Sequence, residues 1–398
     1  MIKLPFKKSS SAKTPKFLTI DVSSDNVKCL AFYKENGHLK IVGSGKVLLE
    51  PGSVRNGVLI DLGQVIRSAE EALGLSKQNV EDEIKNAIVG VSSDLCLENV
   101  TTAKITRGVT LPITNREVEN FSQKITDSSS QQIKEYKAQI SGDREANFQL
   151  IASSVVYASL DGKRVEGLEE GAGQAVEMAL YTAFCPTHHI GAVQKLGKRL
   201  KLNVLAISPI NFALLKALKH TELEHNDLVL VQVGADFTNV GVAFGGAIIK
   251  NKSLPIGYKH FVSEIGRIMG LTYNEAAKVV QTHSRGALTP SESVVVQSCL
   301  EDVLAFWLQG FELIFTNFPG VKTFPSDLYL FGEGIQLPEI KAALDKNQWS
   351  AKLPFKSQPK IKEVQLADLT KVSDSTGALI SPEWIPLAAL SYIYEEVA

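Results

Sequence analysis

The stretch FLTIDVSSDNVKCLAFYKENGHLKIVGSG (residues 17–45) is repeated in plan by DLVLVQVGADFTNVGVAFGGAIIKNKSLPIGYKHF (residues 227–261). Each stretch begins with an apolar strand, passes through a tight polar turn into a second strand, and then reaches a glycine turn. Segments with helical spacing of apolar residues follow each of them. The repeat therefore predicts an α/β protein built from two related domains.

Three polar turns follow strongly apolar strands. They lie in TIDVSSDNVK (19–28), LVQVGADFTNVG (230–241) and LYLFGEGIQLPEI (328–340). A turn of this kind presents backbone N–H groups to a phosphate, and small residues let the backbone approach it closely. An acidic residue at a strand end can hold water around a nucleotide-bound magnesium ion. One such turn is weak support for a ligand site, but three in this order are much stronger support.

Composition limits the other classes of function. The chain has 398 residues, of which 44% are hydrophobic, more than one core usually absorbs. Its 42 basic and 43 acidic residues leave a net charge of -1, which gives no support to nucleic-acid binding. The four cysteines are far apart and form no CxxC pair, so a disulfide framework and a thiolate zinc site are not expected, and a reducing cytoplasm fits.

Pattern changes along the chain suggest its domain organisation. Residues 1–16 form a basic leader without the apolar stretch of a secretory signal, and no later apolar run suggests a membrane span. The first domain is expected at 17–85 and 171–224, interrupted by a small α+β subdomain at 86–170 whose strands pack chiefly with one another. The second domain is expected at 225–380, and a helix at 381–398 returns to the first domain.

Other motifs that look functional are better explained by a structural role. Cys185, His188 and His189 look like metal ligands, but no further ligands stand at suitable spacing. Phe306, Trp307, Phe311 and Phe315 recur at helical spacing, which is typical of a core stripe. No arrangement of serine, histidine and acid stands in a nucleophile-elbow context, so hydrolase chemistry has no independent support.

The three turns, with YASLDGKRVEGLEEGAGQAVEMALYTAF (157–184) and ITNREVENF (113–121), resemble the bacterial cell-division protein FtsA of the actin-like ATPase superfamily. The pilus-assembly protein PilM is a close competitor. The resemblance covers about residues 17–395. It implies an actin-like (ribonuclease H-like) fold, with duplicated domains around a nucleotide cleft and a small inserted subdomain. It also implies ATP or ADP with Mg²⁺ in that cleft.

Carried over residue by residue, the resemblance gives candidate nucleotide contacts on all three loops, and Asp21 as a ligand of the metal through water. The candidates are Asp21, Ser23, Ser24, Lys28, Gly234, Ala235, Thr238, Gly332, Glu333 and Gly334. Two departures matter most. Gln232 stands where the family has an acidic residue, and Asp236 brings negative charge to the second phosphate loop. Since a lost contact to a transferring phosphoryl group costs several kcal/mol, hydrolysis is expected to be slow or absent.

The resemblance implies a scaffold more than an enzyme. An FtsA-like chain would self-associate into filaments and recruit division partners such as the tubulin-like FtsZ. A PilM-like chain would serve a pilus or secretion machine and hold a cytoplasmic peptide of a membrane protein. An active small-molecule kinase is a third alternative, and Gln232 speaks against it. The expected location is the cytoplasm, with peripheral contact at the inner face of the membrane. The acidic ending SPEWIPLAALSYIYEEVA (381–398) does not suggest a membrane-surface helix.

Overall fold

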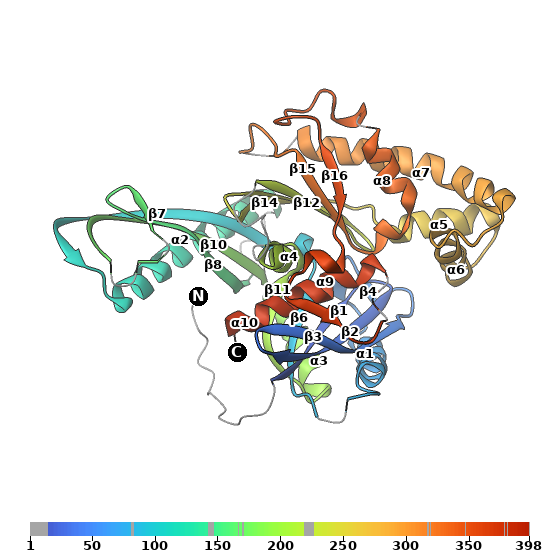
Figure 1. Cartoon of the computed structure of the whole chain (residues 1–398), viewed down its shortest axis with the longest axis horizontal. Helices are drawn as coiled ribbons and strands as arrows, with labels where there is room; N and C mark the ends of the chain where they lie inside the picture. Colours follow the sequence, from blue (N-terminus) through green and yellow to red (C-terminus); the bar gives the residue numbers. More distant parts are fainter. Residues whose placement is uncertain are drawn as a thin grey trace.

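Two sheets with the same strand order form the body of the protein (Figure 1). The computed structural model describes residues 15–397 except 81–82, 142–146, 166, 169–170, 219–226, 317, 319, 347, 378 and 380. The basic leader, up to residue 14, lies outside the described residues.

The first sheet has the order β11-β6-β1-β2-β3-β17. Strands β1, β2 and β3 form an antiparallel meander, and β6 and β11 continue from β1 in parallel. Their bounds are β1 Lys16–Val22, β2 Asn26–Glu35, β3 His38–Leu48, β6 Asn86–Val91, β11 Asn203–Pro209 and β17 Val372–Asp374.

The second sheet has the order β14-β13-β12-β15-β16. Its first three strands again form an antiparallel meander, and β15 and β16 again continue in parallel from the first strand of the meander. The bounds are β12 Leu228–Val233, β13 Thr238–Phe244, β14 Ala247–Leu254, β15 Asp327–Phe331 and β16 Lys360–Glu363. Apart from β17 at the edge of the first sheet, the two sheets have the same plan, which confirms the duplication predicted from the sequence.

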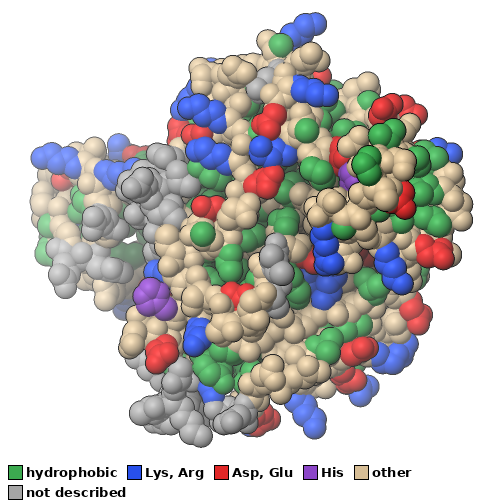
Figure 2. Space-filling view, turned by 45° about the vertical axis from the view of Figure 1, so that its right-hand side comes forward, with side chains coloured by type: hydrophobic (Ala, Val, Ile, Leu, Met, Phe, Trp, Pro, Cys, Tyr) green, Lys and Arg blue, Asp and Glu red, His purple; other side chains and the backbone are tan. Residues whose placement is uncertain are grey.

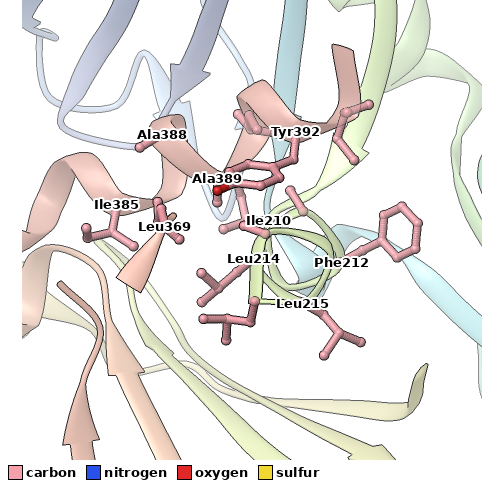
Figure 3. Close-up of a cluster of buried hydrophobic side chains, with 14 of the residues drawn as sticks. Ile210, Phe212, Leu214, Leu215, Leu369, Ile385, Ala388, Ala389 and Tyr392 are labelled. Carbon is pink, nitrogen blue, oxygen red and sulfur yellow. The ribbon is translucent and has the colours of Figure 1, made fainter. Parts of the chain in front are cut away.

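Helices cover both faces of the first sheet because successive residues of a strand point to opposite faces. Leu18 and Ile20 pack with α1 (Leu62–Ser76) and α3 (Thr187–Arg199) on one face. Phe17 packs on the other face with α4 (Ile210–Leu218) and α9 (Ile385–Leu390). Figure 3 shows Leu214 of α4 directed toward the residues of α9.

The second sheet shares one of its faces with this core. Leu228, Leu230 and Phe331 belong to the same buried cluster as α4, so α4 lies between the two sheets. Val229, Val231 and Val233 point to the opposite face, which is covered by four helices. These are α5 Tyr258–Met269, α6 Tyr273–Ser284, α7 Pro290–Thr316 and α8 Pro338–Asp345.

Helix α7 is long and apolar enough to cross a membrane, judged by length and composition alone. Trp307 and Phe311 on one side of it are buried in the core of the second domain, as the sequence analysis expects of that stripe. Phe306, which the sequence analysis places in the same core stripe, is instead exposed, as is Leu313, so the expectation is wrong for Phe306. Figure 2 shows hydrophobic side chains gathered on the right of the molecule, where α5 to α7 lie. Apolar side chains therefore occupy both sides of this helix, one side buried in the core and the other exposed.

The inserted subdomain is a four-stranded sheet of order β7-β10-β8-β9 with α2 packed on it, projecting to the left in Figure 1. Its bounds are β7 Leu97–Pro112, α2 Asn115–Ser141, β8 Phe148–Leu160, β9 Lys163–Val165 and β10 Ala172–Pro186. Sheet pairing differs from the expected range 86–170 at both ends. Strand β6 pairs with β1, whereas β10 pairs with β7 and β8. The polar segment after residue 127 continues α2 as far as Ser141.

The last described part of the chain crosses back to the first domain. Strand β17, expected within the second domain, pairs in parallel with β3. Helix α9 then contacts α4 and β1, and the ring of Tyr394 stacks on Phe17 at 4.0 Å between centroids. The remaining elements are short. They are β4 Val54–Arg55, β5 Val58–Leu59, α10 Tyr394–Val397 and six single 3-10 turns, of which Glu333–Gln336 and Pro382–Trp384 matter below.

Candidate functional site

The three polar turns meet between the two sheets, around a cavity of about 60 Å³. The first two turns follow β1 and β12, the first strands of their sheets in chain order, and the third turn follows β15. All three turns come together in space. Eight of the ten candidate contacts line the cavity: Asp21, Ser23, Ser24, Lys28, Gly234, Ala235, Gly332 and Glu333. The structure thus brings together the residues that the sequence singles out, although they come from segments some 200 and 300 positions apart.

Thr238 and Gly334 have structural positions away from the cavity. The fully buried Thr238 hydroxyl donates to the Ile256 carbonyl and accepts from Trp307 Nε1, at 2.8 Å in each case. A Cβ at Gly334 would lie 2.1 Å from Val233 Cγ1, so the glycine lets the third loop pack directly on β12. In α6, Ala277 and Val280 likewise pack into the core of the second domain.

The first loop is a tight turn held by its own side chains. Asp21 on β1 pairs across the hairpin with Lys28 on β2. The Ser23 amide donates to the Asn26 carbonyl at 2.9 Å, and the Ser23 hydroxyl donates to Asp25 Oδ1 at 2.7 Å. Asp25 also accepts from Asn26 Nδ2 at 2.8 Å. Ser23 therefore fixes the turn through both its backbone and its side chain.

The second loop binds neighbouring protein groups. The Gly234 amide donates to the Phe237 carbonyl at 2.9 Å. Asp236, the unfavourable charge noted in the sequence, accepts from the Asn56 amide at 3.0 Å and lies 3.4 Å from Lys259 Nζ. Gln232 takes part in a neutral pair, since Asn239 Nδ2 donates to its Oε1 at 3.4 Å. The negative charge of Asp236 is therefore balanced by Lys259 and by the hydrogen bond from Asn56.

The third loop places a carboxylate deep in the cleft. Gly332 has a φ of +101°, a conformation that favours glycine, and a Cβ there would lie 2.7 Å from the Val233 carbonyl oxygen. The next residue, Glu333, is only 4% exposed. Its Oε1 accepts from Lys28 Nζ at 2.6 Å and from Asn26 Nδ2 at 2.7 Å. A buried, charge-assisted contact thus joins the first domain to the second.

Further polar contacts surround this pair. Lys28 Nζ also donates to the Glu383 carbonyl at 3.3 Å, and Lys46 forms an ion pair with the Glu383 carboxylate. Tyr273 of α6 donates to Asp25 at 3.4 Å, and Asn239 of β13 donates to Ser92 Oγ at 3.3 Å. Glu383 is a member that the sequence analysis missed, because it lies 355 positions after Lys28 and has no motif of its own.

Burial and charge set the ionisation of these groups. Burial raises the pKa of Asp21 from 3.8 to about 6, which Lys28 opposes in part and Glu333 reinforces. Burial, followed by the nearby Glu333, raises the pKa of Asp25 from 3.8 to about 7. Burial alone would raise the pKa of Glu333, but the nearby charges of Lys28 and Lys46 have the larger effect and lower it. Burial would lower the pKa of Lys28, but Glu333, Glu383 and Asp21 raise it. Lys28 and Glu333 are therefore both charged near neutral pH.

This cleft does not fit a magnesium-bound nucleotide. Pockets that enclose ligands of that size measure about 300–1,000 Å³. The closed cleft, at about 60 Å³, is several times smaller and has room for only a few water molecules. Among the described residues that line the cavity, Asp21, Asp236 and Glu333 are acidic and Lys28 is the only cation. Phosphates would therefore face mostly acidic side chains, and the one cation among these lining residues, Lys28, is already paired with Glu333.

A second, narrow groove lies between the inserted subdomain and α4. Its volume is about 10 Å³, and its walls come from β8, β10, α4 and the start of β14. The lining residues are Ser154, Val155, Val156, Tyr181, Phe212, Leu215, Lys216, Gly246, Ala247 and Ile248. Tyr181 stacks on Phe212 at 4.6 Å between ring centroids. Figure 3 shows Phe212 on the side of α4 away from Leu214.

Fold and cleft together define a protein with the actin-like ATPase fold. The chain is similar to a solved PilM–PilN type IV pilus biogenesis complex, at 14% identity over 96% of this chain and 98% of that one, with a TM-score of 0.68. It is also similar to the ethanolamine utilization protein EutJ from Carboxydothermus hydrogenoformans, at 11% identity over 98% and 92% of the chains, with a TM-score of 0.53. No family model and no curated protein matches the sequence.

Proposed function

We propose that this chain is a PilM-like scaffold that recruits a partner protein by holding an extended segment of it, and that it acts by binding, not by turnover of ATP. The observation that carries the proposal is the unpaired edge of β8 beside the apolar groove. The whole-length similarity to PilM, solved in complex with PilN, supports the choice of PilM among the scaffold families.

The edge of β8 is suited to an added strand. On one side β8 pairs with β10 along its length, from Phe148 to Leu160. On the other side, within the described part of the chain, it pairs only with β9, over residues 158–160. Residues 148–157 therefore leave a row of backbone donors and acceptors to which an extended peptide can pair, a common mode of peptide recognition.

The groove places an apolar surface beside this edge, which side chains of such a peptide would contact. Val155 on β8 is 40% exposed and faces a wall that includes Phe212 and Leu215 of α4. Lys216 holds its ammonium 2.8 Å from Ser154 Oγ and 2.7 Å from Glu396, at the side of the groove. We infer that the partner segment is extended and carries apolar side chains, and that it belongs to the cytoplasmic part of a membrane protein.

The proposal is tested by titrating the purified chain with the cytoplasmic segments of membrane proteins from the neighbouring genes. Val155→Asp should weaken binding at least tenfold, because a carboxylate would be desolvated against the apolar wall. Val109→Asp is the matched control, since Val109 is 58% exposed on β7 and does not line the groove. Equal loss in both variants, or none in Val155→Asp, would refute this site.

A second candidate function is the FtsA-like one, a scaffold that self-associates and recruits an FtsZ-like division protein. The projecting subdomain favours it, because Val109 and Leu111 on its β7 are exposed apolar residues suited to contact a second copy. Sedimentation of the chain with and without an FtsZ-like protein separates the two functions. Location at the cytoplasmic face of the membrane, through a partner, is part of both proposals.

A further inference from the structure

We propose that this chain keeps its two domains closed without a nucleotide, by an internal clasp formed of Lys28, Asn26 and Glu333. In the clasp the Lys28 ammonium and the Glu333 carboxylate provide the link across the cleft that a bound magnesium nucleotide would otherwise provide. The cleft is then a structural joint, whose state does not respond to ATP.

The position of the clasp supports this role. Lys28 and Asn26 stand on β2 in the first sheet, whereas Glu333 follows β15 in the second sheet. Glu333 Oε1 accepts both hydrogen bonds, at 2.6 and 2.7 Å. The side chains of Lys28 and Glu333 are 2% and 5% exposed, so water screens their attraction little. Opening the cleft would break this short ion pair and the hydrogen bond from Asn26, and both charged groups would have to be hydrated instead.

The surroundings of the clasp exclude a competing anion. Asp21 lies across the hairpin from Lys28, Asp236 lines the same cavity, and Asp25 accepts from Asn26 Nδ2. Glu383 holds Lys28 from the other side through its backbone carbonyl. A phosphate could reach Lys28 only by displacing Glu333, and it would leave that carboxylate buried without its cation. The clasp and a nucleotide are therefore alternatives at one place.

Further contacts keep the same closed arrangement. Asn56 of the first domain donates its amide to Asp236 of the second, and Asn251 of β14 donates to Glu98 Oε2 at the start of β7 at 2.7 Å. Asn239 reaches Ser92. The Asn56–Asp236 contact is exposed, the Asn239–Ser92 contact is neutral, and the buried Glu98 has a neutral partner in Asn251. The clasp is the contact in which both partners are charged and buried, so its removal should have the largest effect on opening.

The clasp is tested by hydrogen exchange of the intact chain, followed in peptides that cover 23–28 and 332–337. Glu333→Gln should speed exchange about tenfold or more in both segments, because the cross-domain ion pair is lost. Glu264→Gln is the matched control. Glu264 pairs with Arg267 on the surface of α5, and its loss should leave both segments at the wild-type rate.

A second variant keeps the test decisive if Glu333→Gln does not fold. Lys28→Met combined with Glu333→Gln removes both charges of the clasp together, and it should fold yet exchange faster than wild type. Millimolar Mg²⁺–ATP should change neither exchange nor Tm of the wild-type chain. Protection of wild type by micromolar Mg²⁺–ATP, or wild-type exchange rates in both clasp variants, would overturn the proposal.

Discussion

Asp25 shows how a single buried carboxyl couples the cleft to pH. It accepts hydrogen bonds from Ser23, Asn26 and Tyr273, and it lies close to the negative charge of Glu333. Burial and that charge raise its pKa from 3.8 to about 7. Between these two values the folded protein binds more protons at this site than the unfolded chain does. The contribution of Asp25 to stability is therefore present at low pH and is lost as the pH rises toward 7.

We predict that Asp25→Asn flattens the decline of Tm between pH 5 and pH 8. The amide keeps the size of the carboxyl but cannot ionise, and each pKa unit of difference corresponds to about 1.4 kcal/mol. Asp21 and Glu98, with pKa values raised to about 6 and about 7, act in the same direction, so part of the decline should remain. Asp127→Asn on the exposed face of α2 is the control. An unchanged profile in Asp25→Asn would contradict the assignment.

The contact between α1 and β3 shows how one element is seated on another. A Cβ at Gly43 would lie 1.9 Å from the Ser76 carbonyl oxygen, and one at Gly45 would lie 2.0 Å from that of Ala72. The backbone of α1 therefore rests directly on β3, with no side chain between them. Within α1, by contrast, the side-chain position of Gly74 faces open space.

Gly45→Ala should destabilise the protein by about 1–3 kcal/mol, because the methyl group would push α1 off the sheet. Gly74→Ala should instead stabilise it by about 0.5–1 kcal/mol, because alanine loses less conformational freedom in a helix than glycine. Urea unfolding of the two variants measures both changes. The opposite order of stabilities would show that α1 can shift at little cost.

The sequence predicts the repeated elements well, but it predicts poorly which strands pair and which side chains contact each other. The two strand–turn–strand units and the three loops follow from local apolar patterns and turn residues. The ends of the insertion do not, because nothing local to β6 or β10 says which sheet each will join. The same holds within the site. Lys28 and Glu333 were both identified as candidate ligand contacts, but their pairing depends on distance in the fold and not on spacing in the chain.

For the molecule as a whole, the inserted subdomain is less independent than its sequence suggests. Its outer half has a core of its own, which includes Phe121, Ile125 and Met178. Its inner half does not, since Tyr181 and Ala183 belong to the same buried cluster as Phe212 of α4. Its strands do pair with one another in a sheet of their own, but the side chains of the half nearest the body also pack on α4.

Replacing residues 97–186 by a short linker should lower the Tm of the remaining chain, because Phe212 and its neighbours would lose their cover. Replacing 86–170 should be worse still, since it also removes β6 from the centre of the first sheet. Thermal unfolding followed by circular dichroism measures both effects. A Tm equal to that of the full chain in the 97–186 replacement would show that the shared core contributes nothing.

Tyr394 stacks on Phe17, and α9 covers β1, so the first domain is assembled from residues near both ends of the described chain. A ribosome makes β1 early and Tyr394 only after the whole second domain has emerged. The second domain is continuous from β12 to β16, so it can fold before the first domain does. The first domain can fold fully only after its last helix has been synthesised. The order of maturation during synthesis is thus the reverse of the order along the chain.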